Sequence, residues 1–143
     1  MPSNAKRYAE IERLVLREAP KWCARLGIDH IIIDYAFLDS YFGDDGEEDF
    51  KVSAVTEGRW QYDQAKVKFY LPSCARHDDA EIVRILVHEL CHVVLMPEQS
   101  LVDTVRTWDV VEDKTLDVMT DLRELSTERM TRIVLRAYQS EGV

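Results

Sequence analysis

The sequence predicts an α+β domain: an N-terminal helix, a small and mostly antiparallel three-stranded sheet, a central helix and a C-terminal helix. Apolar residues recur with helical spacing near both ends and in the centre of the chain. Three short runs rich in β-branched and aromatic residues lie between the first two helical segments. No repeat, low-complexity tract or Pro/Gly/Ser-rich linker interrupts the 143 residues, so we expect residues 1–143 to form a single domain.

The overall composition excludes several classes of protein. The chain is 46% hydrophobic and 31% charged, as globular domains are, and its three widely spaced cysteines form no CxxC pair. No apolar run approaches the roughly 20 residues of a membrane span, and no apolar signal core opens the chain, so we expect a cytoplasmic protein without membrane contact. A net charge of −9 would repel phosphates, so no nucleic-acid partner is expected. The sequence indicates no particular oligomeric state.

The first predicted element is a helix over residues 4–26. Apolar residues such as Ile11 and Trp22 recur on one side of it, and Gly27 provides a stop signal at its end. Pro20 is expected to kink this helix or to restart it as a second short helix, because proline removes one backbone hydrogen bond.

Three strands are predicted next, over residues 30–39, 50–58 and 65–71, because these runs are β-branched or alternate between apolar and polar residues. An acidic turn or loop is expected at 43–49. If neighbouring strands pair as hairpins, the sheet is mostly antiparallel.

The second half of the chain is predicted to be helical. Asp78, with Glu81 three residues later, resembles a capping box and starts a helix over 79–95. Residues 100–113 are expected to form a loop with a helical turn, and 115–138 the last helix. The residues of that last helix expected to face the core are Leu116, Met119, Leu122, Met130, Ile133, Val134 and Ala137.

The central helix contains "LVHELCHVVL" (86–95), in which three ionisable groups interrupt an apolar stretch. Burying such groups costs several kcal/mol each unless they are paired or coordinated. His88 and His92 are four residues apart, so both imidazoles can bind one zinc ion from the same helix face. Glu89 is turned about 100° around the helix, where a carboxylate can take a proton from metal-activated water. The pattern is therefore H-E-x-x-H on a helix, which is typical of zinc metalloproteases.

Two histidines and a water leave zinc one protein ligand short. The chain continues as VVLMPE, so it lacks the third histidine of the longer pattern H-E-x-x-H-x-x-G-x-x-H. His77 lies about 16 Å away along the helix, too far to reach the site, and His30, at the start of a strand, is a weaker but open candidate. A carboxylate of the last helix is the remaining option. Spacing does not choose among the four acidic residues on its stripe, which are Asp117, Asp121, Glu124 and Glu128.

H-E-x-x-H followed about 30 residues later by a helix carrying E-x-x-x-D/E resembles the gluzincin type of zinc metallopeptidase. More narrowly, "ILVHELCHVVL" with "RELSTERMTRIVLRAY" is similar to small phage-encoded metallopeptidases. The second segment also resembles the E-x-x-A-N-x-F-A stretch of ImmA/IrrE-type peptidases. The resemblance implies a zincin-like fold with zinc held by His88, His92 and Glu124, and Glu128 hydrogen-bonded to the first histidine. In this alignment Glu128 replaces a neutral asparagine and Thr127 replaces an alanine.

Motif and resemblance together predict a zinc-dependent peptidase that hydrolyses a peptide bond by metal-activated water, with Glu89 as general base. Its expected partner is a peptide or protein substrate that lies along an exposed strand, 50–57 or 65–71, by β-augmentation. Two alternatives stay open: a non-catalytic zinc-containing binding or regulatory protein, and a zinc hydrolase of a non-peptide amide. Glu89 argues against the first, because a structural zinc site closes its fourth position with Cys or His.

Overall fold

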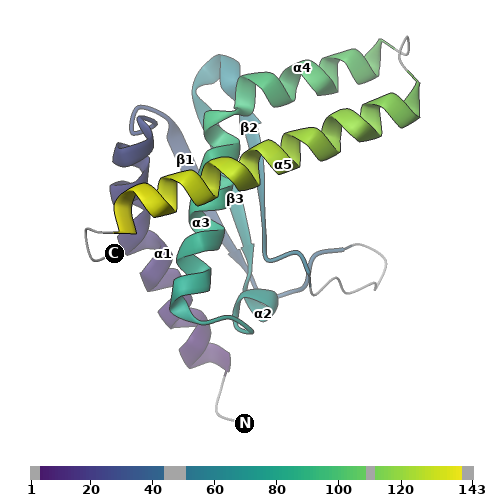
Figure 1. The fold of residues 1–143 in the computed structure, drawn as a ribbon. Coiled ribbons are helices and arrows are strands. Elements are labelled where there is room, and N and C mark those ends of the chain that lie inside the picture. Colours follow the sequence, from purple (N-terminus) through teal and green to yellow (C-terminus); the bar gives the residue numbers. More distant parts are fainter. Residues whose placement is uncertain (1–3, 44–50, 109–111, 140–143) are drawn as a thin grey trace.

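The computed structural model describes residues 4–43, 51–108 and 112–139 (Figure 1). It confirms the α+β class, with one sheet and several helices. Residues 44–49 of the expected acidic loop lie outside the described residues. In chain order the elements are α1 (Asn4–Leu26), β1 (Ile32–Leu38), β2 (Ala54–Arg59), the 3-10 turn η1 (Trp60–Tyr62), β3 (Gln64–Tyr70), α2 (Leu71–Cys74), α3 (Asp79–Val94), α4 (Met96–Thr107) and α5 (Asp113–Tyr138).

The sheet is mixed, so the expectation of a mostly antiparallel sheet was wrong. Its strand order is β1-β3-β2, with β3 antiparallel to β2 but parallel to β1. The hairpin of β2 and β3 forms as expected, whereas β1 pairs with the far side of β3. Local sequence patterns identify each strand but not its neighbours, because the pairing depends on how the long β1–β2 connection runs.

One face of the sheet is covered by helices. Along β3 the side chains of Ala65, Val67 and Phe69 are buried, whereas Lys66 and Lys68 alternate with them and are partly exposed. The buried side chains join the core with those of α1 and α3, and these two helices also pack on each other. Helix α3 therefore packs on one face of the sheet, which fixes its position.

Helix α1 is continuous through Pro20, so the predicted restart does not occur. Pro20 is exposed, and a carbonyl that loses its partner on this side can bond to water. Helix α3 agrees with its prediction: the Asp78 carboxylate accepts a hydrogen bond from the Glu81 backbone N–H at 2.9 Å. Ile82, Leu86 and Leu90 are fully buried along α3 and fix it on the sheet.

Helix α4 occupies most of the segment expected to be a loop, so that expectation was wrong. Pro97 lies in the first turn of α4, where the missing N–H of proline costs nothing, and it therefore starts a helix as well as ending the previous one. Val102 and Leu116 are buried where α4 and α5 meet. In Figure 1 α4 and the N-terminal half of α5 extend side by side beyond the rest of the domain. Residues 109–111 lie outside the described residues.

The buried side of α5 was predicted only in part. Leu116 is buried, and Met130 and Val134 pack against the core, but Leu122, Ile133 and Ala137 are exposed. The fully buried positions in the middle of the helix are two threonines. Each hydroxyl donates to the carbonyl four residues earlier, at 3.0 Å for Thr127 and 2.8 Å for Thr131, so each buried proton has an acceptor within the helix.

The described part of the chain contains no helix with the length and apolar character needed to cross a membrane. All three cysteines are free and buried. Burial raises the pKa of Cys91, inside the H-E-x-x-H turn, to about 11, which favours the thiol over the more reactive thiolate.

Candidate metal centre

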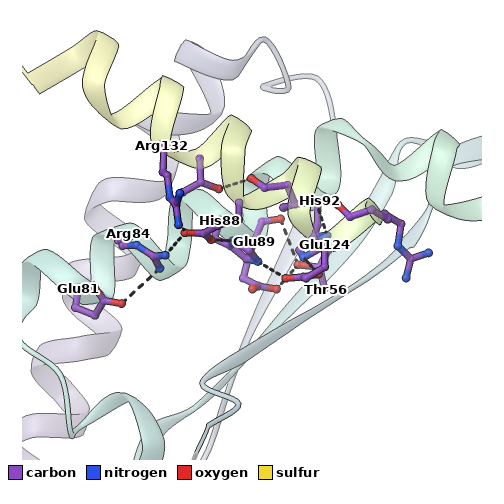
Figure 2. A network of polar contacts seen from close by, with 12 residues as sticks. Thr56, Glu81, Arg84, His88, Glu89, His92, Glu124 and Arg132 are labelled. Atoms are coloured by element: carbon purple, nitrogen blue, oxygen red, sulfur yellow. Dashed lines mark hydrogen bonds and ion pairs between the residues drawn. The ribbon is translucent and has the colours of Figure 1, made fainter. Parts of the chain in front are cut away.

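Three side chains from α3 and α5 meet at one point (Figure 2). His88 and His92 project from α3, their ring centroids 4.9 Å apart, and Glu124 projects from α5 between them. Nε2 of His88 lies 2.8 Å from Glu124 Oε1, and Nε2 of His92 lies 3.2 Å from Oε2. One ligand atom from each residue lies within 4.8 Å of the others, a set that could hold a metal ion. Of the four carboxylates left open by spacing, Glu124 is the one that reaches both imidazoles.

The remaining ring nitrogens of the two histidines have partners that set their tautomers. Nδ1 of His88 lies 2.9 Å from Glu128 Oε2, a carboxylate that can only accept, so Nδ1 donates. Nδ1 of His92 lies 3.4 Å from the hydroxyl of Thr127. That hydroxyl donates its single proton to the Arg123 carbonyl, so it also accepts from the imidazole. With Nδ1 protonated, each Nε2 can either donate a second proton to Glu124 or offer its lone pair to a metal ion between them.

An imidazole lone pair and a carboxylate oxygen 2.8 Å apart need a positive charge between them, either a proton or a cation. The pKa values agree with this requirement. Hydrogen bonds from His88 and His92 hold the pKa of Glu124 well below its usual range. Burial lowers the pKa of His88, but the hydrogen bond to Glu124 and the nearby carboxylate charges outweigh it, so the net shift is upward. Two nitrogens and a carboxylate thus form a site that attracts cations.

Glu89 lies beside this group but is held by a different element. Its side chain is buried, with 5% of the residue exposed, and its Oε1 accepts a 2.8 Å hydrogen bond from the Thr56 hydroxyl on β2. Burial raises the pKa of Glu89, although the charge of His92 and the bond from Thr56 oppose the shift. A buried carboxylate with a raised pKa is suited to exchanging protons near neutral pH.

Glu128, the residue that replaces asparagine in the resemblance, is surrounded by positive charge. Arg84 forms an ion pair with its Oε1, and Arg132 Nε lies 3.6 Å from the same oxygen. Arg84 also contacts Glu81 at 3.5 Å, one turn earlier on α3 (Figure 2). The two guanidiniums balance the carboxylate charge while its other oxygen faces His88. The additional negative charge is therefore compensated locally.

A cleft of about 520 Å³ gives access to the site. Residues 51–56 form one wall of the cleft, and α3 and α5 form the other. His88, Glu89, His92 and Glu124 all line it. His77 also lines the cleft, but neither His77 nor His30 belongs to the metal-competent group found among the described residues.

The structure brings together every site residue proposed from the sequence, namely His88, Glu89, His92, Glu124 and Glu128. Sequence reasoning missed Thr56 and Thr127. Thr56 lies on another element and carries no motif, whereas Thr127 lies three residues after Glu124 on the same side of the helix, and this spacing is a detectable signal. Comparisons with protein-family models, with curated proteins and with solved structures give no significant match.

Proposed function

We propose that this protein is a zinc-dependent peptidase with a zincin-like fold. The observation that carries the proposal is the convergence of His88, His92 and Glu124 beside the buried Glu89 in one cleft. Two imidazole nitrogens and one carboxylate are a ligand set of catalytic zinc sites, which keep a further position for water or substrate. Zinc, when bound, would lower the pKa of water and polarise a substrate carbonyl.

Glu89 would act as general base. It takes the proton of the attacking water and passes it to the nitrogen of the leaving amine. Its raised pKa favours both steps, because the carboxylate must accept a proton and release it again. Thr56 holds the carboxylate from β2 and so orients it in the wall of the cleft.

The edge of β2 is the proposed binding site for the peptide. β3 is the central strand and pairs on both sides, so the 65–71 alternative is wrong. Among the described strands β2 is an edge strand with one side unpaired, and its first residues line the cleft. A peptide that adds to this edge would lie next to the metal ligands.

The hydrogen-bond pattern of β2 identifies the backbone groups that are available. Ser53 pairs with Tyr70 through a 2.9 Å bond from the Tyr70 N–H to the Ser53 carbonyl. Antiparallel pairs alternate, so the N–H and C=O groups of Ala54 and Thr56 point away from β3. Both residues line the cleft, where these groups can bond to a substrate backbone.

Ala54→Pro tests this edge. It removes an N–H that faces the cleft, so we expect kcat/KM for a peptide to fall about 3–10-fold, the value of one net hydrogen bond. Val55→Pro is the matched control: its N–H faces β3, so urea denaturation should show a loss of stability. A folded Ala54→Pro variant with unchanged kcat/KM would argue against substrate pairing at this edge.

Metal analysis combined with a hydrolysis assay tests the function itself. We expect one equivalent of zinc, and cleavage of casein or of an unbiased peptide library that stops on chelation and returns with zinc. Full zinc occupancy without cleavage of any peptide would instead favour a non-catalytic zinc-binding protein. Cleavage restricted to small amides would favour the non-peptide hydrolase.

Glu128→Ala should weaken zinc binding about 10–100-fold, because it removes the group that fixes the His88 tautomer. A competition titration against a chromogenic chelator measures the change. Glu81→Ala is the control, since Glu81 contacts the same Arg84 but does not contact His88. Equal affinities in the wild type and Glu128→Ala would mean that Glu128 contributes only to the charged surface of α5.

A further inference from the structure

The outward side of α5 carries four exposed apolar residues. Helix α5 lies across the outside of the domain (Figure 1). Its buried Thr127 faces α3, where its hydroxyl lies 3.4 Å from His92 Nδ1. On the opposite side Val118, Leu122, Leu125 and Ile133, here called the outer stripe, are 52%, 56%, 45% and 69% exposed. Their spacings of four, three and eight residues place them on one helix face. Single exposed apolar residues are ordinary, but an apolar stripe along a helix is typical of a packing surface.

Charged residues lie along the outer stripe. Lys114, Asp117 and Asp121 lie beside its N-terminal half, whereas Arg129 and Arg136 lie on the same face in its C-terminal half, with Arg132 beside them. Arg132 contacts Glu128 of its own helix. Within the described part of the chain neither Asp121 nor Arg129 forms an ion pair. Asp121 and Arg129 therefore lie on either side of Leu125, with opposite charges that the described part of their own chain does not pair.

This pattern is complementary to itself when reversed. Asp121 lies four residues before Leu125, and Arg129 lies four residues after it. Val118 lies seven residues before Leu125, and Ile133 lies eight after it. In an antiparallel pair of α5 helices with Leu125 at the two-fold axis, Asp121 of one copy lies opposite Arg129 of the other, and Val118 lies beside Ile133. The symmetry repeats both contacts on the other side of the axis.

We propose that the outer stripe is a dimer interface whose occupant is α5 of a second copy of this chain. A two-fold axis requires one surface to be complementary to itself, and the outer stripe meets that condition in both apolar and charged positions. The paired opposite charges counteract the repulsion between two chains that each carry a net charge of −9. The interface does not depend on the proposed peptidase activity, because the metal-binding group lies where α5 meets α3.

Sedimentation equilibrium of the full chain tests the dimer. We expect the wild type to be dimeric at about 100 µM and to dissociate on dilution. Leu125→Glu places two carboxylates at the axis and should give a monomer with an unchanged circular dichroism spectrum. Leu101→Glu on α4 is the matched control, because Leu101 is also exposed (59%) but lies outside the outer stripe. A monomeric wild type at about 100 µM, or equal disruption by both variants, would overturn the proposal.

Charge reversal tests the register. Asp121→Arg alone and Arg129→Asp alone should each weaken association about tenfold or more, because each creates like-charge pairs on both sides of the axis. The double variant restores opposite charges and should return the dissociation constant to within about threefold of the wild type. A double variant as weak as either single variant would show that these residues do not face each other, and would refute the antiparallel arrangement.

Discussion

Replacing Glu89 with glutamine is expected to lower peptide hydrolysis about 10²–10⁴-fold while zinc content stays near that of the wild type. The amide keeps the size of the side chain, and its oxygen can still accept the bond from Thr56. It cannot take a proton from water, so only the acid–base contribution is lost. Glu89 is not part of the metal-competent group, and binding should therefore be preserved.

The measurement is kcat/KM on one cleaved peptide together with zinc stoichiometry for the same preparation. Glu57→Gln is the control, because Glu57 is an exposed glutamate of β2 whose contact is an ion pair with Lys68 on the sheet. Its activity should match the wild type. Full activity of the zinc-loaded Glu89→Gln variant would exclude Glu89 as the base.

The helices that carry the site could be predicted because their signals are local. Asp78 and Glu81 mark the start of α3, and the i, i+4 spacing alone places His88 and His92 on one face. The proposed third ligand could not be chosen from local signals, because four acidic residues of α5 share a stripe and the one that reaches the histidines depends on how α5 crosses α3. The structure selects Glu124 through its 2.8 Å and 3.2 Å contacts with the two imidazoles.

Failures of prediction occurred where tertiary contacts override local pattern. The buried face of α5 was assigned to Leu122 and Ile133, because apolar residues normally occupy the core side of a helix. Instead Thr127 is buried, since its hydroxyl serves both the Arg123 carbonyl and His92. The side of α5 that carries Thr127 thus faces α3, and Leu122 and Ile133 stay exposed. The parallel pairing of β1 with β3 could not be predicted either, because no residue within a strand specifies which strand pairs with it.

Replacing His88 with alanine should abolish stoichiometric zinc binding and hydrolysis together. The substitution removes one of three proposed protein ligands and leaves the Glu128 carboxylate without the imidazole that it orients. The loss of zinc affinity should exceed the about 100-fold that removal of a supporting partner can cost. In this respect His88→Ala differs from Glu89→Gln, which loses turnover but not metal.

Thermal unfolding with and without zinc gives a readout that is independent of any substrate. A ligand that binds only the folded state stabilises it by about 2.7 kcal/mol at 100 times its dissociation constant, so zinc should raise the Tm of the wild type. His88→Ala should show no such rise. His77→Ala should keep it, because His77 lines the same cleft but lies outside the metal-competent group. If His88→Ala kept the full zinc-dependent rise in Tm, the ion would bind elsewhere, and the proposed roles of Glu124 and Glu89 would lose their basis.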